Sequence, residues 1–346
     1  MRVLVTGATG LAGSHVVERL LAGGHTVRAL VRPTSDRSGL QGLDVEFATG
    51  DVTAPATLGA AAAGCEGVVH TAAIVGGWGR PEAFFRVGVL GTRNLLNAAR
   101  DAGVRRFVQL SSIAVYGDDL DGRLLRETDP YGYRPQPWNH YVREKVQSEQ
   151  LAFSYHLRGW LEVAAVRPSV IWGARDRIAY PTAAALVCSP FAALVGSGRN
   201  RIPCVGVRDV ADVAVRALEL PQAAGRAYNV SSAQQITQQQ LYRLVARTLD
   251  RPVPRLHVPL WFAFGLGAVC EAAYQLARID SPPPLTRFNV GLIASDVRVD
   301  CTAAQRELGW HEQHPVPLAI AESAAWTHAQ GGTPAAGVAG AAGRGA

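Results

Sequence analysis

Short apolar runs alternate with amphipathic segments along the first half of the chain. The runs are rich in β-branched side chains, which is typical of strands buried in a parallel sheet. They predict strands at 3–5, 27–31, 45–48, 67–70, 107–110 and 161–166, and a later run predicts one more at 227–230. Between them, helical spacing of apolar side chains predicts helices at 11–22, 54–63, 81–102 and 139–158.

This alternation indicates an α/β fold, a doubly wound parallel sheet of the Rossmann type with helices on both faces. After Arg167 the pattern breaks up into segments richer in Pro, Trp and long apolar runs, which predict a smaller C-terminal lid domain that binds the substrate. The expected division is 1–173 and 205–232 for the Rossmann domain, 174–204 and 233–328 for the substrate-binding domain, and 329–346 for a disordered Gly/Ala-rich tail.

Charge and cysteine content narrow the class of protein. The net charge of +6 comes from scattered arginines, which favours a basic enzyme with an anionic ligand over a nucleic-acid binder. The five cysteines lie far apart and the histidines show no ligand spacing, so we expect reduced thiols and no metal. The first strand begins at Arg2 and leaves no room for a signal peptide, so we expect a cytoplasmic protein.

A glycine-rich turn separates the first strand from the first helix. Gly7 allows a tight turn, Gly10 lets backbone N–H groups approach a pyrophosphate, and Gly13 lets helix and strand pack closely. The helix N-terminus then faces the phosphates. We therefore expect the turn to bind a dinucleotide through the residues Gly7, Thr9, Gly10, Leu11, Ala12 and Gly13.

The residue after the second strand bears on the choice of dinucleotide. A carboxylate there would accept hydrogen bonds from the adenosine ribose and repel a 2′-phosphate. This chain has Arg32 instead, followed by Pro33. The sequence therefore favours NADP(H) over NAD(H), with a merely solvated Arg32 as the alternative.

Tyr141 and Lys145 form a YxxxK pattern within a predicted helix. Spacing of i and i+4 puts the phenol and the ammonium on one face. A cation beside a phenol favours the phenolate, so Tyr141 could exchange a proton near neutral pH. Among 34 basic residues Lys145 is the only lysine, which indicates an ammonium that a guanidinium cannot replace.

Ser111 and Ser112 follow the fifth strand. A hydroxyl at this place can bond a substrate oxygen and stabilise charge that develops on it.

Asp209 near a predicted helix start is interpreted as a helix cap. For His70 and His140, which lie beside these motifs, a structural role is favoured over a catalytic one.

Together these motifs resemble the short-chain dehydrogenase/reductase superfamily. The GxxGxxG spacing in TGATGLAG, the YxxxK pattern and the segment RPSVIWG, similar to the RPxxVYG motif, match its extended branch. The resemblance implies that Ser112, Tyr141 and Lys145 are catalytic. It also implies cofactor contacts for Asp51, Val52, Ala72, Ala73 and Pro168, besides Tyr141 and Lys145 themselves.

One departure concerns the fourth helix. The superfamily usually has an asparagine in an NVxGT context that anchors a water chain to the lysine, whereas this chain has Gly88 in GVLGT. Proton relay to solvent is altered, or another group serves. Ile113 and Ala114 stand where sugar dehydratases of this branch have an Asp-Glu pair, which argues against dehydration.

The C-terminal half decides between sugars and apolar substrates. Segments 258–266, 282–287 and 308–310, and Trp78 with the following glycine, resemble the 3β-hydroxysteroid dehydrogenase-like group. The resemblance extends over about residues 1–325. The apolar stretch 258–270 is too short to span a membrane; it lines a pocket, touches a membrane surface or forms a core helix.

We therefore expect an NADP(H)-dependent oxidoreductase that interconverts a ketone and a secondary alcohol on a small apolar molecule such as a steroid, polyketide or fatty ketone. One rival is a nucleotide-sugar epimerase that retains NAD. A second is a dinucleotide sensor without catalysis, against which Tyr141, Lys145 and Ser112 argue. The resemblance also implies a homodimer.

Overall fold

The structure is a computed structural model that describes residues 1–132 and 136–331. Its centre is a seven-stranded parallel sheet with the order β12-β7-β5-β4-β1-β2-β3. The strands are β1 Arg2–Thr6, β2 Thr26–Val31, β3 Val45–Thr49, β4 Gly67–His70, β5 Arg106–Leu110, β7 Glu162–Pro168 and β12 Ala227–Val230. This confirms the predicted doubly wound sheet, including its late strand.

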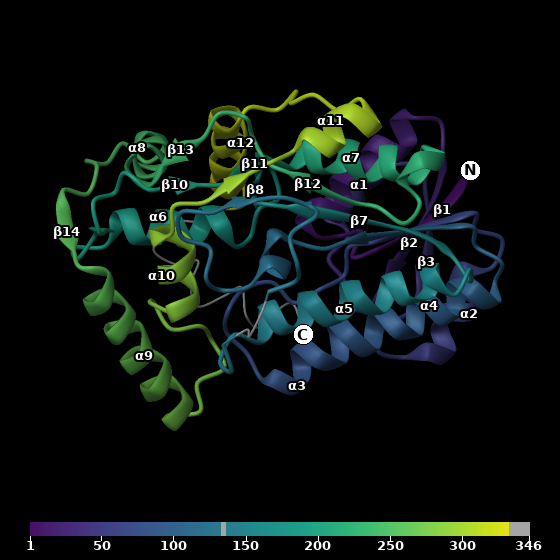
Figure 1. Ribbon diagram of the computed structural model, residues 1–346, viewed down its shortest axis with the longest axis horizontal. Coiled ribbons are helices and arrows are strands. Elements are labelled where there is room, and N and C mark those ends of the chain that lie inside the picture. The colour runs from purple at the N-terminus through teal and green to yellow at the C-terminus, as the bar shows by residue number, and fades with distance from the viewer. Residues whose placement is uncertain (133–135, 332–346) are drawn as a thin grey trace.

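Helices cover both faces of the sheet (Figure 1). Successive side chains of a strand point to opposite faces, so Val3 and Val5 pack in one core and Leu4 in another. One face is covered by α1 Leu11–Ala22, α7 Val207–Glu219 and α11 Thr302–Leu308. The other is covered by α2 Leu58–Ala62, α4 Gly91–Asp101 and α5 His140–Leu157.

The predicted helix at 81–102 is interrupted by a wider turn. Its parts are α3 Pro81–Phe84, a π-helical segment η3 Phe85–Leu90, and α4. π-Helical turns inside α-helices are frequent at functional sites. The predicted helix at 54–63 is shorter than expected, because Pro55 begins a 3₁₀ turn, η2 Pro55–Thr57, before α2.

Apart from α7, β12 and α11, the elements after β7 gather at one end of the sheet (Figure 1). The helices there are α6 Ala179–Cys188, α8 Gln238–Thr248, α9 Leu260–Leu276, α10 Arg287–Ala294 and α12 Val316–Ala329. The short strands there are β8 Val170–Trp172, β9 Ala193–Val195, β10 Arg201–Ile202, β11 Cys204–Gly206, β13 Ile236–Thr237, β14 Leu256–Val258 and β15 Arg298–Val299, the last paired with β6 Leu124–Leu125. The remaining 3₁₀ turns are η1 Ser38–Leu40, η4 Ile113–Tyr116 and η5 Pro221–Ala223.

The segment around α11 packs on the Rossmann core. Leu308 and Trp310 are buried in the same cluster as α1 and α7, although the sequence placed them in the substrate-binding domain. Most of the predicted disordered tail, 332–346, lies outside the described residues. No described helix is long and apolar enough to cross a membrane.

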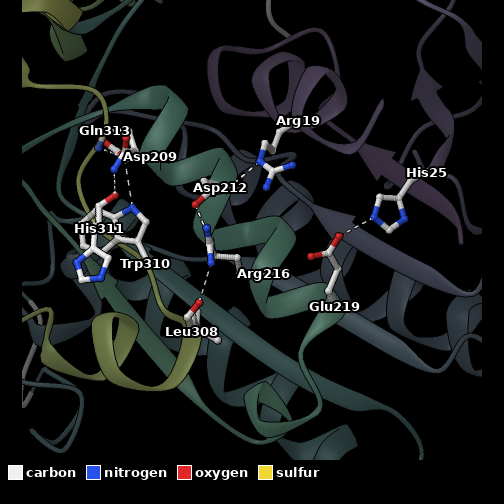
Figure 2. A network of polar contacts seen from close by, with 10 residues as sticks. All are labelled: Arg19, His25, Asp209, Asp212, Arg216, Glu219, Leu308, Trp310, His311 and Gln313. Atoms are coloured by element: carbon white, nitrogen blue, oxygen red, sulfur yellow. Dashed lines mark hydrogen bonds and ion pairs between the residues drawn. The ribbon is translucent and has the colours of Figure 1, made fainter. Parts of the chain in front are cut away.

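Polar contacts of α7 hold this segment in place (Figure 2). Asp209 accepts hydrogen bonds from the Trp310 indole at 3.2 Å and from the backbone N–H groups of Gln313 and His314, each at 2.9 Å. The expectation that Asp209 caps its own helix is wrong, since Gly206 is the N-cap. Asp209 instead accepts hydrogen bonds from backbone N–H groups of the segment after α11, which packs on α7.

Candidate active site

The predicted cofactor residues meet at the carboxyl edge of the sheet. β1 lies between β2 and β4, so the strand order reverses at β1, and in open α/β sheets ligands bind beyond the strand ends at such a reversal. The glycine turn follows β1, Arg32 follows β2, Asp51 and Val52 follow β3, Ala72 and Ala73 follow β4, and Pro168 ends β7. Parallel strands therefore bring to one edge residues that are far apart in sequence.

The glycine turn has the geometry expected of a phosphate cradle. Gly7 has a φ of +66°, and a Cβ on it would lie 2.7 Å from the backbone nitrogen of Ala72. A Cβ on Gly13 would lie 2.2 Å from the carbonyl oxygen of Gly7, so only glycine lets α1 approach β1 this closely. Gly10 is the N-cap of α1, which directs N–H groups outward toward an anion. The cradle fits a dinucleotide.

The chain after β2 offers a cation rather than a carboxylate. The Arg32 backbone N–H donates to Ser35 Oγ at 3.0 Å, which turns the chain beyond the strand. The first carboxylate that follows, Asp36, accepts hydrogen bonds from Arg177 at 2.6 Å and from the Ser38 N–H at 3.0 Å. Asp36 is thus already held by residues of this chain.

Asp51 and Val52 form a tight turn after β3. Asp51 Oδ1 accepts hydrogen bonds from the Thr53 N–H at 2.7 Å and the Thr53 hydroxyl at 2.8 Å. The Val52 carbonyl accepts one from Asn94 of α4 at 3.0 Å. These bonds fix the turn at the carboxyl end of β3.

Ser112 caps the 3₁₀ turn η4. Its Oγ accepts a hydrogen bond from the Ala114 N–H at 3.1 Å, so its own proton can be donated to a substrate oxygen. Ser111 beside it is buried. The turn η4 packs directly against α5, which carries Tyr141.

Tyr141 and Lys145 lie on the first turns of α5, as predicted. Lys145 Nζ is 5.7 Å from the centre of the Tyr141 ring, and the Lys145 side chain is almost completely buried. Asn139 caps α5 by accepting from the Val142 N–H at 3.2 Å, and its amide donates to Asp118. Asp118 follows η4, so this contact ties the helix start to the turn that carries Ser112. Neither Asn139 nor Asp118 was predicted from the sequence.

Negative groups surround the buried ammonium of Lys145. Burial alone would lower the pKa of Lys145, but the Glu144 carboxylate, the Tyr141 phenol and Glu149 outweigh it, so the pKa lies above its usual value. Glu144 Oε2 is 3.7 Å from Nζ. Lys145 therefore stays protonated through the neutral range and can hold the Tyr141 phenolate.

His70 lies below this site and is structural, as expected. Its ring nitrogens are 2.6 Å from the Thr6 hydroxyl and 3.0 Å from the Thr92 hydroxyl. Burial, with a smaller effect of the Lys145 charge, lowers the pKa of His70 to about 3. His140 only packs its ring against Phe84, with centroids 6.3 Å apart.

Aromatic side chains from the C-terminal segments face Tyr141. The Phe288 ring of α10 meets the Tyr141 ring edge-on, with centroids 5.7 Å apart. Trp138, just before α5, packs on Phe264 of α9 at 6.0 Å. The Tyr141 ring thus meets one aromatic ring from the C-terminal segments.

Helix α9 holds most of the apolar stretch 258–270, and the core-helix interpretation of it is wrong. Of its side chains only those of Ala263 and Glu271 are buried, together with the backbone at Gly267. Large exposed side chains project from the rest of the helix: Leu260, Trp261, Phe262, Leu266, Val269 and Leu276.

Comparison with known proteins agrees with this geometry. Residues 3–231 match the NAD dependent epimerase/dehydratase family. The sterol demethylase protein B of Methylococcus capsulatus is 33% identical, covering 96% of this chain and 99% of that protein. The 4-hydroxy-2-methyl-3-oxo-4-farnesyl-3,4-dihydroquinoline-1-oxide ketoreductase of Stigmatella aurantiaca is 30% identical, covering 90% and 92%.

A solved structure has the same fold over nearly the whole chain. The crystal structure of gox2253 superposes with a TM-score of 0.78 at 30% identity, covering 95% of this chain and 98% of that one. The chain belongs to the NAD dependent epimerase/dehydratase family, and it is an NAD(P)-dependent oxidoreductase of the extended short-chain dehydrogenase/reductase superfamily.

Proposed function

We propose that this protein is an NADP(H)-dependent reductase or dehydrogenase that interconverts a ketone and a secondary alcohol on an apolar molecule. The main support for an apolar substrate is the packing of Phe288 against Tyr141, because it puts an aromatic side chain beside the proton-transferring phenol. Trp138 and Phe264 form a second aromatic contact, between the residue before α5 and helix α9. The named relatives support an apolar substrate, because one is named for sterols and one for a farnesylated ketone.

The placement of three side chains supports the catalytic roles proposed for them. Bound NADP(H) supplies or accepts the hydride. Tyr141 gives a proton to the carbonyl oxygen in reduction and takes it back in oxidation. Lys145 stabilises the phenolate, and Ser112 donates a hydrogen bond to the same substrate oxygen, where negative charge develops.

The preference for NADP(H) rests on Arg32. A guanidinium after β2 can pair with a 2′-phosphate through charge-assisted hydrogen bonds. The absence of a carboxylate directly after β2 and the engagement of Asp36 by Arg177 support this preference.

We also propose that α9 rests on an anionic membrane surface from which the enzyme takes its substrate. Trp261 is 75% exposed and Val269 65%, although both are apolar. Exposed arginines stand at both ends of the helix, Arg255 before it and Arg278 after it. An apolar helix flanked by cations fits the boundary of an anionic bilayer.

The test of the reaction is ketone-dependent oxidation of NADPH, followed by absorbance at 340 nm. The panel contains keto-steroids, β-keto acids and simple cyclic ketones, each also tried with NADH. We expect turnover with NADPH and an apolar ketone, and a loss of at least about a hundredfold in Tyr141→Phe because general acid catalysis is removed. Cofactor affinity of Tyr141→Phe, measured by fluorescence titration, should be nearly unchanged.

Two results would contradict the proposal. If no ketone is reduced and NAD stays bound through purification, the protein is a retained-cofactor epimerase and sugar nucleotides become the substrates to test. If cofactor binds and exchanges but nothing turns over, the sensor alternative holds.

A further inference from the structure

Glu144 is a buried acid that the reaction described above does not use. It directly precedes Lys145, and both side chains are only 3% exposed. Glu144 Oε2 has no hydrogen-bond partner among the described residues, and the Lys145 ammonium lies 3.7 Å away. A buried carboxylate is costly unless an opposite charge is near, so Glu144 depends on Lys145.

The space that holds the Glu144 carboxyl is provided by Gly88. A Cβ on Gly88 would lie 2.1 Å from Glu144 Cγ and 2.2 Å from Oε1, far inside contact distance. Gly88 sits in the π-helical turn Phe85–Leu90, which packs against α5. Any side chain at position 88 would therefore expel the acid from beside Lys145.

We propose that Glu144 is a positioning residue that, from the space left by Gly88, holds the Lys145 ammonium in place and charged beneath Tyr141. The role rests on the proposed function only in that Lys145 acts through Tyr141; the contact itself is independent of the substrate. Gly88 and Glu144 form a complementary pair, because the Glu144 side chain fits beside Lys145 only if position 88 has no side chain.

The charge of Glu144 matters here more than its volume. An apolar side chain of similar size could fill the same space without the cost of burying an acid. Burial raises the pKa of the Glu144 carboxyl, while the charge of Lys145 acts in the opposite direction. The other titratable groups around Lys145 are Tyr141, Glu149 and His70, and Glu149 is already bonded to Arg167 at 3.0 Å.

The only lysine of the chain permits a direct measurement. Labelling with ¹³Cε-lysine, in protein purified without a lysine-containing tag, gives a single NMR signal, whose shift with pH reports the titration of Lys145. In Glu144→Gln the side chain beside the Lys145 ammonium keeps its shape but loses its negative charge. We expect the Lys145 titration to move to lower pH by about one unit, as for loss of an opposite charge within contact range.

Activity gives the second readout. In Glu144→Gln the pH above which kcat falls should decrease by as much as the pH of the Lys145 titration does. KM should change little. The control is Gln147→Ala, an exposed residue of the same helix, which should move neither quantity.

The partnership with Gly88 is tested by a double-mutant cycle. Gly88→Ala should reproduce the shift by displacing Glu144, yet add nothing in a Glu144→Ala background. Gly88→Ala also serves if Glu144→Gln does not fold. An unchanged Lys145 titration in folded variants overturns the inference, and so does an additive cycle. An inactive wild type that still shows the NMR shift contradicts the proposed reaction but not the role of Glu144.

Discussion

Arg32 is the residue from which the choice between two cofactors can be tested. In Arg32→Ala we expect the Kd for NADPH to rise about tenfold or more, since a hydrogen-bonded charge contributes about 1.5–3 kcal/mol. The Kd for NADH should hardly change, because NADH lacks the 2′-phosphate. Fluorescence titration with both cofactors measures the two constants.

The control for Arg32 is another arginine of the same loop. Arg37 stacks on the exposed Phe47 ring, with its guanidinium carbon 4.9 Å from the ring centre. Arg37→Ala removes the same charge from the same region. If it weakens NADPH binding as much as Arg32→Ala does, or if Arg32→Ala weakens both cofactors equally, Arg32 does not select the phosphate.

Residue roles that depend on local spacing were predictable from the sequence, and roles that depend on distant partners were not. Gly7 and Gly13 act within one turn, so the motif alone indicated their geometry. Glu144 lies inside the YxxxK pattern but draws its importance from Gly88, on another helix. The sequence showed that Gly88 departs from the superfamily, but only the folded chain shows which side chain occupies its space.

At the scale of elements, a buried ion pair joins β7 to α5. Arg167 donates to Glu149 at 3.0 Å and to the Tyr116 hydroxyl at 2.9 Å, and Tyr116 donates to Asn229 at 2.7 Å. The Tyr116 hydroxyl thus links β7 to β12 within this network. The pair keeps α5, and with it Tyr141, in register with the sheet.

We expect Arg167→Met to lower the free energy of unfolding by about 3–5 kcal/mol, because it leaves Glu149 buried and unpaired. The double variant Arg167→Met/Glu149→Met should recover much of that loss. Urea denaturation provides the measurement. Arg226, whose side chain is 57% exposed in its pair with Glu307, is the control, and Arg226→Ala should cost less than about 1 kcal/mol. Equal losses for the two arginines would contradict this account.

Elements with a strong pattern were predicted nearly to the residue, and those shaped by tertiary contacts were not. The helix α1 and the strand β4 have the predicted bounds. The π-helical turn in 81–102 was not foreseen, because apolar spacing over a whole segment predicts a helix and does not distinguish a π-helical turn within it. Helix α9 resembles a core segment in sequence, and only its position shows that most of its apolar side is exposed.

At the scale of the whole molecule, one face of the sheet mainly stabilises the fold and the other carries the helix with the catalytic residues. The face covered by α1 and α7 also holds the chain at 308–314, through contacts that stabilise the fold (Figure 2). The opposite face carries α5, whose first turns reach the carboxyl edge. Helix α9 lies at the end remote from the N-terminus (Figure 1), so it can touch a surface without covering the sheet.

This position leads to a prediction about the intact protein. It should sediment with vesicles that contain phosphatidylglycerol, bind neutral phosphatidylcholine vesicles less, and release with rising salt, because the flanking arginines supply the electrostatic part of the binding. The double variant Trp261→Asp/Val269→Asp should lose this binding. Turnover of a water-soluble ketone should stay unchanged.

The matched control is Leu157→Asp, which places the same charge on an apolar side chain that is 85% exposed at the far end of α5. It should bind vesicles like the wild type, since it leaves α9 intact. Equal loss of binding in Leu157→Asp would mean that added negative charge alone explains the effect. If the wild type instead self-associates, and the α9 variant is monomeric without any vesicle binding in either protein, the apolar helix contacts a second copy of the chain and the membrane proposal is wrong.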